Sequence, residues 1–368
     1  MSEVPWAAVL SILVAVPVVA GLLVVALVLA WAGPSAIRSL LQRRPAPGAP
    51  LNPRPAADCS SALNVGLSVG FHVQAFSSGL RAAVWYPTNS AEASFRYPGG
   101  LASTMALNAP VAECAQYPLV VFSHGFRGSS IQSIFLTEEL ARAGYIVIAP
   151  DHKDSLGKVD QPMKGHLLRR GREPFIRPGK WTDASYRDRA VDIKLVLDEI
   201  LRDPRFGPRI DPSKIGGAGH SLGGYTILGL SGGWTSWKDD RIKAALLMSP
   251  YVAPYLSAGT LPSVHIPVMY QGGTRDFTIT PRVKRSGGAY DAANPPKYFV
   301  EFARVHHLDW STLVCGSYGS VAECLAGSLS ARLINAYAIA FLNRYLKGRP
   351  EPLLDRSNSE VAQFRHAS

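Results

Sequence analysis

The 368-residue sequence contains few charged residues and few cysteines, and these residues form no recognisable binding motif. Charged residues make up 18% of the chain and apolar residues 47%, a composition that predicts a folded body with a large buried core. The net charge of +11 suits a membrane surface or an anionic substrate. However, the basic residues are scattered, and the sequence has no nucleic-acid-binding motif or basic tail, so we expect no nucleic-acid partner. A simply solvated surface is the alternative.

The four cysteines lack the paired C-x-x-C spacing of zinc sites, and we expect no metal. Their even number permits two disulfides and so an oxidising compartment, whereas four buried free thiols are the alternative. The pairing of the cysteines stays open at this stage: Cys59, Cys114, Cys315 and Cys324.

Residues 6–32 form a long apolar stretch that contains no charged residue. As a helix this stretch is long enough to cross a hydrocarbon core of about 30 Å, and Trp6 and Trp31 lie at its ends like interfacial anchors. A cleaved signal peptide is the alternative, because Ala30-Trp31-Ala32 resembles a cleavage site. The stretch is longer than a usual signal core, and residues 1–5 contain no Lys or Arg. We therefore predict an uncleaved single-pass membrane anchor.

A proline-rich linker, residues 33–57, follows this stretch and is expected to form an extended spacer. The orientation of the anchor stays open. Arg38, Arg43 and Arg44 after the span, and Glu3 before it, favour a cytoplasmic body by the positive-inside rule. The even cysteine count favours the opposite side.

The folded body is predicted to comprise residues 58–348, and residues 349–368 to form a C-terminal tail. Apolar strand-like runs alternate with helix-like segments throughout the body, without an internal repeat. This alternation predicts an α/β fold with a mostly parallel central sheet covered by helices on both faces. Strands are expected at 79–87, 117–125, 145–151, 214–219, 242–249, 266–273 and 297–303, and helices at 130–144, 183–203, from 222, and 329–346.

A serine flanked by glycines marks one strand-to-helix junction. Residues 219–223 read G-H-S-L-G, which fits the G-x-S-x-G nucleophile elbow with Ser221 as the nucleophile. A strand precedes the motif and a helix follows it, as this turn requires. A dinucleotide-binding motif fails by one residue, because Leu222 occupies the third glycine position.

A nucleophilic serine needs a base and an acid that orients the base, and in this architecture they follow in the order Ser, Asp, His. We choose His307 as the base, with His306 in reserve, because both lie in a loop after the last predicted strand. Asp276 follows a late strand and is our choice for the acid. Asp309 is too close to the histidines in sequence to be the first choice.

Two backbone N–H groups are candidates for an oxyanion hole. One is that of Leu222, directly after the serine, and the other is that of Phe126, in the loop after an earlier strand. Phe126 is also a candidate for lining the acyl pocket, and a buried aromatic residue without a catalytic part is the alternative. The basic segment 163–180 is predicted to form a small lid or a membrane-facing loop, with a solvated insertion as the alternative.

Four motifs together resemble a known family: "RAAVWYPT", "VVFSHGFRGSS", "GHSLGGYT" and "HHLDW". They are similar to the platelet-activating-factor acetylhydrolase and dienelactone-hydrolase-like branch of the α/β-hydrolases, over roughly residues 65–348. The resemblance implies a serine esterase that needs no metal or organic cofactor. The chain departs from the animal acetylhydrolases at Ser249, which stands where they carry the acid. Asp276 is then the acid, as in dienelactone-hydrolase-like and polyester-hydrolase-like enzymes.

The working hypothesis is a membrane-anchored serine hydrolase of carboxylic esters, with short-acyl or phospholipid-type esters as substrates. A lipase-like or polyesterase-like activity, or acyl transfer to an acceptor other than water, uses the same three residues. A non-catalytic, membrane-tethered binding protein is the alternative from another class.

Overall fold

The computed structural model describes residues 67–113, 116–157, 159 and 175–368 of the chain. Eleven strands in this part form one sheet, in the order β11-β10-β9-β8-β7-β5-β6-β2-β1-β4-β3. The strands are β1 Ser68–Ala75, β2 Arg81–Thr88, β3 Ala93–Arg96, β4 Ala102–Leu107, β5 Tyr117–Ser123, β6 Ile146–Pro150, β7 Ile210–His220, β8 Ile242–Met248, β9 Val268–Gly273, β10 Lys297–Phe302 and β11 Gln363–Ala367.

The centre of the sheet is parallel, as the sequence predicts. Strands β6, β5, β7, β8, β9 and β10 pair in parallel, because a helical connection carries the chain back between them. Antiparallel pairs lie outside this block, β6–β2 and β2–β1 on one side and β10–β11 on the other. The last strand, β11, comes from residues that the sequence analysis places in the C-terminal tail.

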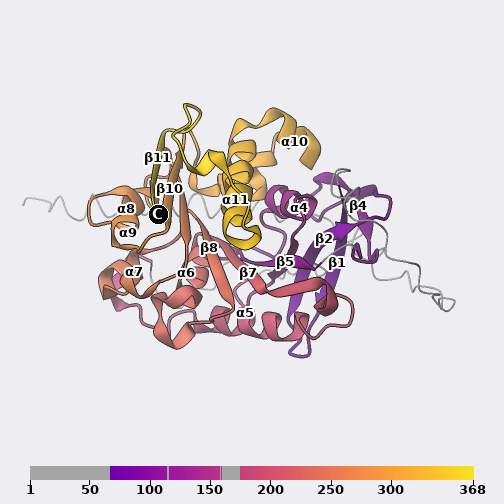
Figure 1. Cartoon of the computed structure of the whole chain (residues 1–368), viewed down its shortest axis with the longest axis horizontal. Helices are drawn as coiled ribbons and strands as arrows, with labels where there is room; N and C mark the ends of the chain where they lie inside the picture. The colour runs from indigo at the N-terminus through magenta and orange to yellow at the C-terminus, as the bar shows by residue number, and fades with distance from the viewer. Residues whose placement is uncertain (1–66, 114–115, 158, 160–174) are drawn as a thin grey trace, which may run out of the picture.

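Helices cover both faces of the sheet (Figure 1). On β5, Leu119 and Val121 belong to one hydrophobic core, whereas Val120 and Phe122 belong to a second, because successive side chains of a strand point to opposite faces. Helices α5 and α6 contribute to the first core, and α4 and α11 to the second. The helices are α4 Ile134–Arg142, α5 Arg187–Ile200, α6 Leu222–Leu228, α7 Ala253–Ala258, α8 Thr280–Lys284, α9 Ala289–Ala292, α10 Val321–Gly327 and α11 Leu329–Lys347.

Several helices differ in length from the sequence-based expectation. Both α4 and α5 begin four residues later than expected, after turns in which the chain is not yet helical. Helix α6 ends at Leu228 and continues as a π-helical turn over Gly229–Gly233. The start of α6 directly after Ser221 agrees with the expectation.

A disulfide joins Cys315 to Cys324, and both residues are fully buried in the second core. The bond fixes the segment that leads from the 3₁₀ turn at Thr312–Cys315 into α10. Cys59 and Cys114 lie outside the described residues.

Within the described ranges, no single helix has the length and apolarity needed to cross a membrane. Helices α10 and α11 reach the required length and apolar composition only when taken together, and the chain bends by 96° between them. The predicted anchor at 6–32, the linker at 33–57 and most of the predicted lid lie outside the described residues.

Candidate active site

Ser221 lies at the sharp turn between β7 and α6. Its φ of 54° and ψ of −114° are strained for a residue with a side chain, and although it occupies the N-cap position, its side chain caps no backbone N–H. The two flanking glycines make this turn possible. A Cβ on Gly219 would lie 2.4 Å from the backbone of Gly223, and a Cβ on Gly223 would lie 1.8 Å from the carbonyl oxygen of Ser123. The helix therefore packs directly on the ends of the central strands.

The structure brings His307 to the nucleophile candidate. The Nε2 atom of His307 is 2.9 Å from the Oγ of Ser221. His307 begins the 3₁₀ turn His307–Trp310, which follows β10, and its side chain is 29% exposed. The reserve candidate, His306, instead has its Nε2 3.4 Å from the guanidinium of Arg275.

Asp276 follows β9 and is buried, with its carboxylate beside His307. Its Oδ2 is 3.3 Å from the Nδ1 of His307, and its Oδ1 accepts a hydrogen bond from the backbone of Ile279 at 3.3 Å. Burial alone would raise the pKa of this carboxyl. Hydrogen bonds from His307 and Ser249 outweigh burial and lower the pKa of Asp276 to about 2. The carboxylate is therefore charged at neutral pH.

Ser249 is a third polar group at this point, and the sequence analysis noted it only as the residue in place of an acid. It follows β8 with a φ of 42°, and its hydroxyl donates a short hydrogen bond to the Oδ2 of Asp276. Its Oγ is also 2.8 Å from the Nδ1 of His307, closer than the carboxylate. The Nδ1 proton of His307 is thus shared between a hydroxyl and a carboxylate. No motif in the sequence marks this role.

The two predicted oxyanion donors belong to segments that meet at Ser221: Leu222 follows it directly, and a Cβ on Gly125, the residue before Phe126, would lie 3.5 Å from the Cβ of Ser221. Within the described part of the chain, the backbone N–H groups of Phe126 and Leu222 have no hydrogen-bond acceptor. Leu222 opens α6, and Phe126 lies in the turn that follows β5, the strand next to β7. Two free donors beside a serine hydroxyl form an arrangement that can stabilise negative charge on a substrate oxygen.

A fully buried arginine holds the loop that carries Phe126. Arg189 of α5 donates to the backbone carbonyls of His124, at 2.7 Å, and Gly125, at 3.1 Å. Asp154 binds the same guanidinium through both carboxylate oxygens, at 2.9 and 3.0 Å. Because a guanidinium carries several donors in a rigid plane, Arg189 binds both carbonyls at once and so fixes the backbone of the loop.

Two histidines beside this arginine are uncharged. Burial, and then the positive charge of Arg189, lower the pKa of His124 and of His152 well below the usual range. His152 lies between the hydroxyl of Ser123, at 2.9 Å, and the carboxylate of Asp192, at 2.9 Å. Ser123 and His152 of this second Ser-His-Asp arrangement are buried and Asp192 is partly exposed, so the serine is closed to a substrate and the arrangement supports the backbone.

An aromatic group lies beside Ser221. The backbone N–H of Tyr251 donates to the carbonyl oxygen of Ser221 at 3.0 Å, and its ring contacts Phe175 and Trp181 at centroid distances of 5.0 Å. Phe175 in turn contacts Phe126 at 5.3 Å. An apolar wall therefore runs from the loop after β5 to the segment after β8.

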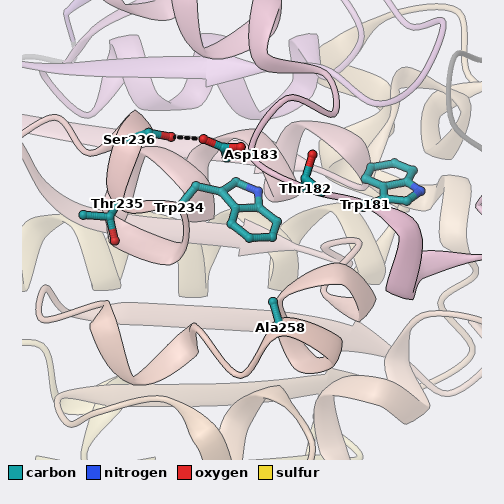
Figure 2. A pocket seen from close by; sticks show the side chains of 7 residues that line it. All are labelled: Trp181, Thr182, Asp183, Trp234, Thr235, Ser236 and Ala258. Atoms are coloured by element: carbon teal, nitrogen blue, oxygen red, sulfur yellow. Dashed lines mark hydrogen bonds between the residues drawn. The ribbon is translucent and has the colours of Figure 1, made fainter.

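A hollow of about 480 Å³ is lined in part by Trp181, which contacts Phe175 and Tyr251 of this wall (Figure 2). It is lined by Trp181, Thr182, Asp183, Trp234, Thr235, Ser236 and Ala258. The hydroxyl of Ser236 donates to Asp183 at 2.7 Å, so this carboxylate already has a partner. No predicted site residue lines the hollow. Among the described residues, no group of three or more His, Cys, Asp or Glu side chains could hold a metal ion.

The sequence of this chain is similar to those of known ester hydrolases. Residues 76–165 match the family model "Platelet-activating factor acetylhydrolase, isoform II". The platelet-activating factor acetylhydrolase of Cavia porcellus is 23% identical over 271 residues, which cover 65% of this chain and 60% of the relative. Cutinase 2 of Thermobifida cellulosilytica is 24% identical over 234 residues, which cover 62% of this chain and 69% of the relative.

A solved structure shares the fold. The ferulic acid esterase from Streptomyces cinnamoneus superposes with a TM-score of 0.58 at 23% identity, over 82% of this chain and 96% of its own. All of these proteins are named as hydrolases of carboxylic esters. The chain spans about three fifths of the length of the guinea-pig acetylhydrolase that it matches.

Proposed function

Since its matches and fold place the chain among the α/β-hydrolase serine esterases, we propose that it hydrolyses carboxylic esters at Ser221. The observation that carries the proposal is the 2.9 Å separation of the Ser221 hydroxyl and the His307 imidazole. This contact occurs at a strained turn that exists only because Gly219 and Gly223 allow close approach of the backbone. A structural serine needs neither the strain nor the imidazole.

In the first half-reaction, the Nε2 of His307 takes the proton of the Ser221 hydroxyl as Oγ attacks the ester carbonyl carbon. The carbonyl oxygen becomes an oxyanion that accepts hydrogen bonds from the N–H groups of Phe126 and Leu222. Asp276 stabilises the imidazolium through its charge and keeps the remaining proton on Nδ1. The C–O bond to the alcohol then breaks, and His307 returns its proton to the leaving oxygen.

In the second half-reaction, a water molecule takes the place of the alcohol. His307 removes a proton from the water as the water oxygen attacks the acyl-enzyme carbonyl. The same N–H groups stabilise the second oxyanion. The bond to Ser221 Oγ breaks, Oγ receives the proton, and the acid is released.

The surroundings of the site favour esters with an apolar part. The aromatic wall of Phe126, Phe175 and Tyr251 offers apolar contact beside the nucleophile. Ile176, beyond Phe175, is 79% exposed, and Phe277, beside Asp276, is 77% exposed, so two large apolar side chains reach into solvent near the site. We propose short-acyl or phospholipid-type esters as the substrate class. A series of p-nitrophenyl esters of increasing acyl length tests it, and a strong preference for long chains would favour a lipase-like or polyesterase-like enzyme instead.

The nucleophile is tested with Ser221→Ala in the full chain. We expect hydrolysis of p-nitrophenyl acetate to fall by at least about 10⁴-fold, because no other group supplies the covalent intermediate. A fluorophosphonate probe should label the wild type and not the variant. Ser78→Ala, at an exposed turn between β1 and β2, is the matched control and should keep full activity. Ester hydrolysis or labelling that survives in Ser221→Ala would refute the proposal.

A further inference from the structure

A glutamine links the loop after β5, which carries Phe126 and is called the oxyanion loop below, to His220, the residue before Ser221. The side-chain Oε1 of Gln132 accepts a hydrogen bond from the backbone N–H of Gly125 at 2.8 Å. The other end of the amide, Nε2, lies 2.9 Å from the Nδ1 of His220. Because a backbone N–H can only donate, the amide oxygen must face Gly125, and the amide NH₂ must face His220.

This orientation determines where the proton of His220 lies. Nδ1 accepts from the amide of Gln132, so it carries no hydrogen, and in the neutral ring the hydrogen is on Nε2. Nε2 is 2.8 Å from the backbone carbonyl oxygen of His307, which can only accept. Burial, and then the charge of His307, lower the pKa of His220 to about 3, so the ring is neutral when it makes both bonds.

The turn that carries His307 is bound to the same segment as Gln132. The hydroxyl of Ser133 donates to the carbonyl oxygen of Trp310 at 2.6 Å. The hydroxyl of Thr312 donates to the carbonyl oxygen of Gln132 at 2.7 Å. The start of α4 therefore supports both the loop after β5 and the turn after β10.

We propose that Gln132 and His220 are positioning residues that hold the backbone of His307 in a fixed relation to the oxyanion loop. The chain of bonds runs from the Gly125 N–H through Gln132 and His220 to the His307 carbonyl. It places the base and one oxyanion donor on a common hydrogen-bonded support, although these groups are far apart in the sequence. The effect of this chain of bonds on catalysis rests on the proposed function, whereas the position of the hydrogen on His220 is independent of that function.

Gln132→Glu tests one bond of the chain at a time, because the two side chains have the same shape. The carboxylate still accepts from the Gly125 N–H but has no hydrogen to donate to His220. Nδ1 must then carry a proton itself, and His220 either loses its donor to the His307 carbonyl or becomes a cation beside the base. We expect kcat for p-nitrophenyl acetate to fall about tenfold, with KM changed less than about twofold. Gln74→Glu, on the distant strand β1, is the matched control and should leave kcat unchanged.

The position of the His220 ring hydrogen is measured by NMR of the full chain labelled with ¹⁵N-histidine at neutral pH. A ring nitrogen that carries a hydrogen differs strongly in ¹⁵N chemical shift from one that does not. The wild-type His220 should show a hydrogen on Nε2 alone, and Gln132→Glu should show one on Nδ1. A wild-type His220 that carries its hydrogen on Nδ1 would overturn the chain of bonds. A proton that moves in Gln132→Glu without a fall in kcat would overturn the positioning role. An inactive wild type with the expected tautomer would refute the proposed function and support the chain of bonds.

Discussion

Asp276→Asn and Ser249→Ala separate the two groups that share the Nδ1 proton of His307. Ser249 is the closer acceptor, at 2.8 Å against 3.3 Å for Asp276. Only Asp276 carries a charge, because the hydrogen bonds that it accepts keep its pKa at about 2. The geometry alone would favour the hydroxyl as the orienting group, whereas the electrostatics favour the carboxylate.

The expected sizes follow from the distances. Two unit charges 3.3 Å apart, at an effective dielectric constant of about 20, attract each other by about 5 kcal/mol. This attraction acts on the imidazolium formed in the transition state. With His307 partly exposed and Ser249 still present, we expect Asp276→Asn to lower kcat/KM by about a thousandfold. Ser249→Ala removes the hydrogen bond to His307 and the one donated to the Asp276 carboxylate but leaves the charge of Asp276, and it should lower kcat/KM by about tenfold.

The assay is kcat/KM for p-nitrophenyl acetate in the wild type, both single variants and the double variant. Because both groups bind the same imidazole, the effects should not add, and the double variant should be close to Asp276→Asn. Circular dichroism and thermal unfolding report whether each variant is folded. A larger loss in Ser249→Ala than in Asp276→Asn would refute the reasoning and make the hydroxyl the orienting group.

Two further predictions concern stability. Burial raises the pKa of Glu138 to about 7, so the folded state keeps a proton that the unfolded state releases above pH 4.5. This proton stabilises the folded protein at low pH, and its contribution to the free energy of unfolding is lost as the pH rises through 7. Glu138→Gln should therefore gain about 2–3 kcal/mol relative to wild type between pH 5 and pH 8, measured by urea unfolding, and a constant difference would contradict this. Replacing Cys315 and Cys324 together by serine should lower the free energy of unfolding by about 2–3 kcal/mol, because the bond closes a loop across nine positions. Unchanged urea unfolding of that double variant would contradict it.

The central strands were predictable from the sequence because each carries its own signal. Strands such as β5 are buried along their whole length and read as continuous apolar runs bounded by turn residues. The outer strands carry no such signal. In β11, the sequence QFRHA is at most half-buried, and its strand conformation depends on pairing with β10 rather than on its own pattern.

The candidate site divides in the same way. Ser221 lies in a motif whose spacing states its role, and the order of Asp276 and His307 along the chain follows from the fold. Gln132 and Ser249 carry no such mark, because their importance comes from contacts across 88 and 58 positions of the chain, respectively. A sequence cannot show which of many polar residues will meet at such a distance.

The buried Arg189 has a consequence for how the enzyme responds to acidity. Burial, and then the permanent charge of Arg189, keep its neighbours His124 and His152 uncharged, and the same charge holds the pKa of Asp154 far below the usual range. Arg189, the two histidines and Asp154 thus keep one protonation state at neutral pH, whereas burial raises the pKa of Asp192, the partner of His152, to about 6. A titration of the rate near pH 6 can therefore arise from Asp192 beneath the loop, and not from Arg189, His124, His152 or Asp154.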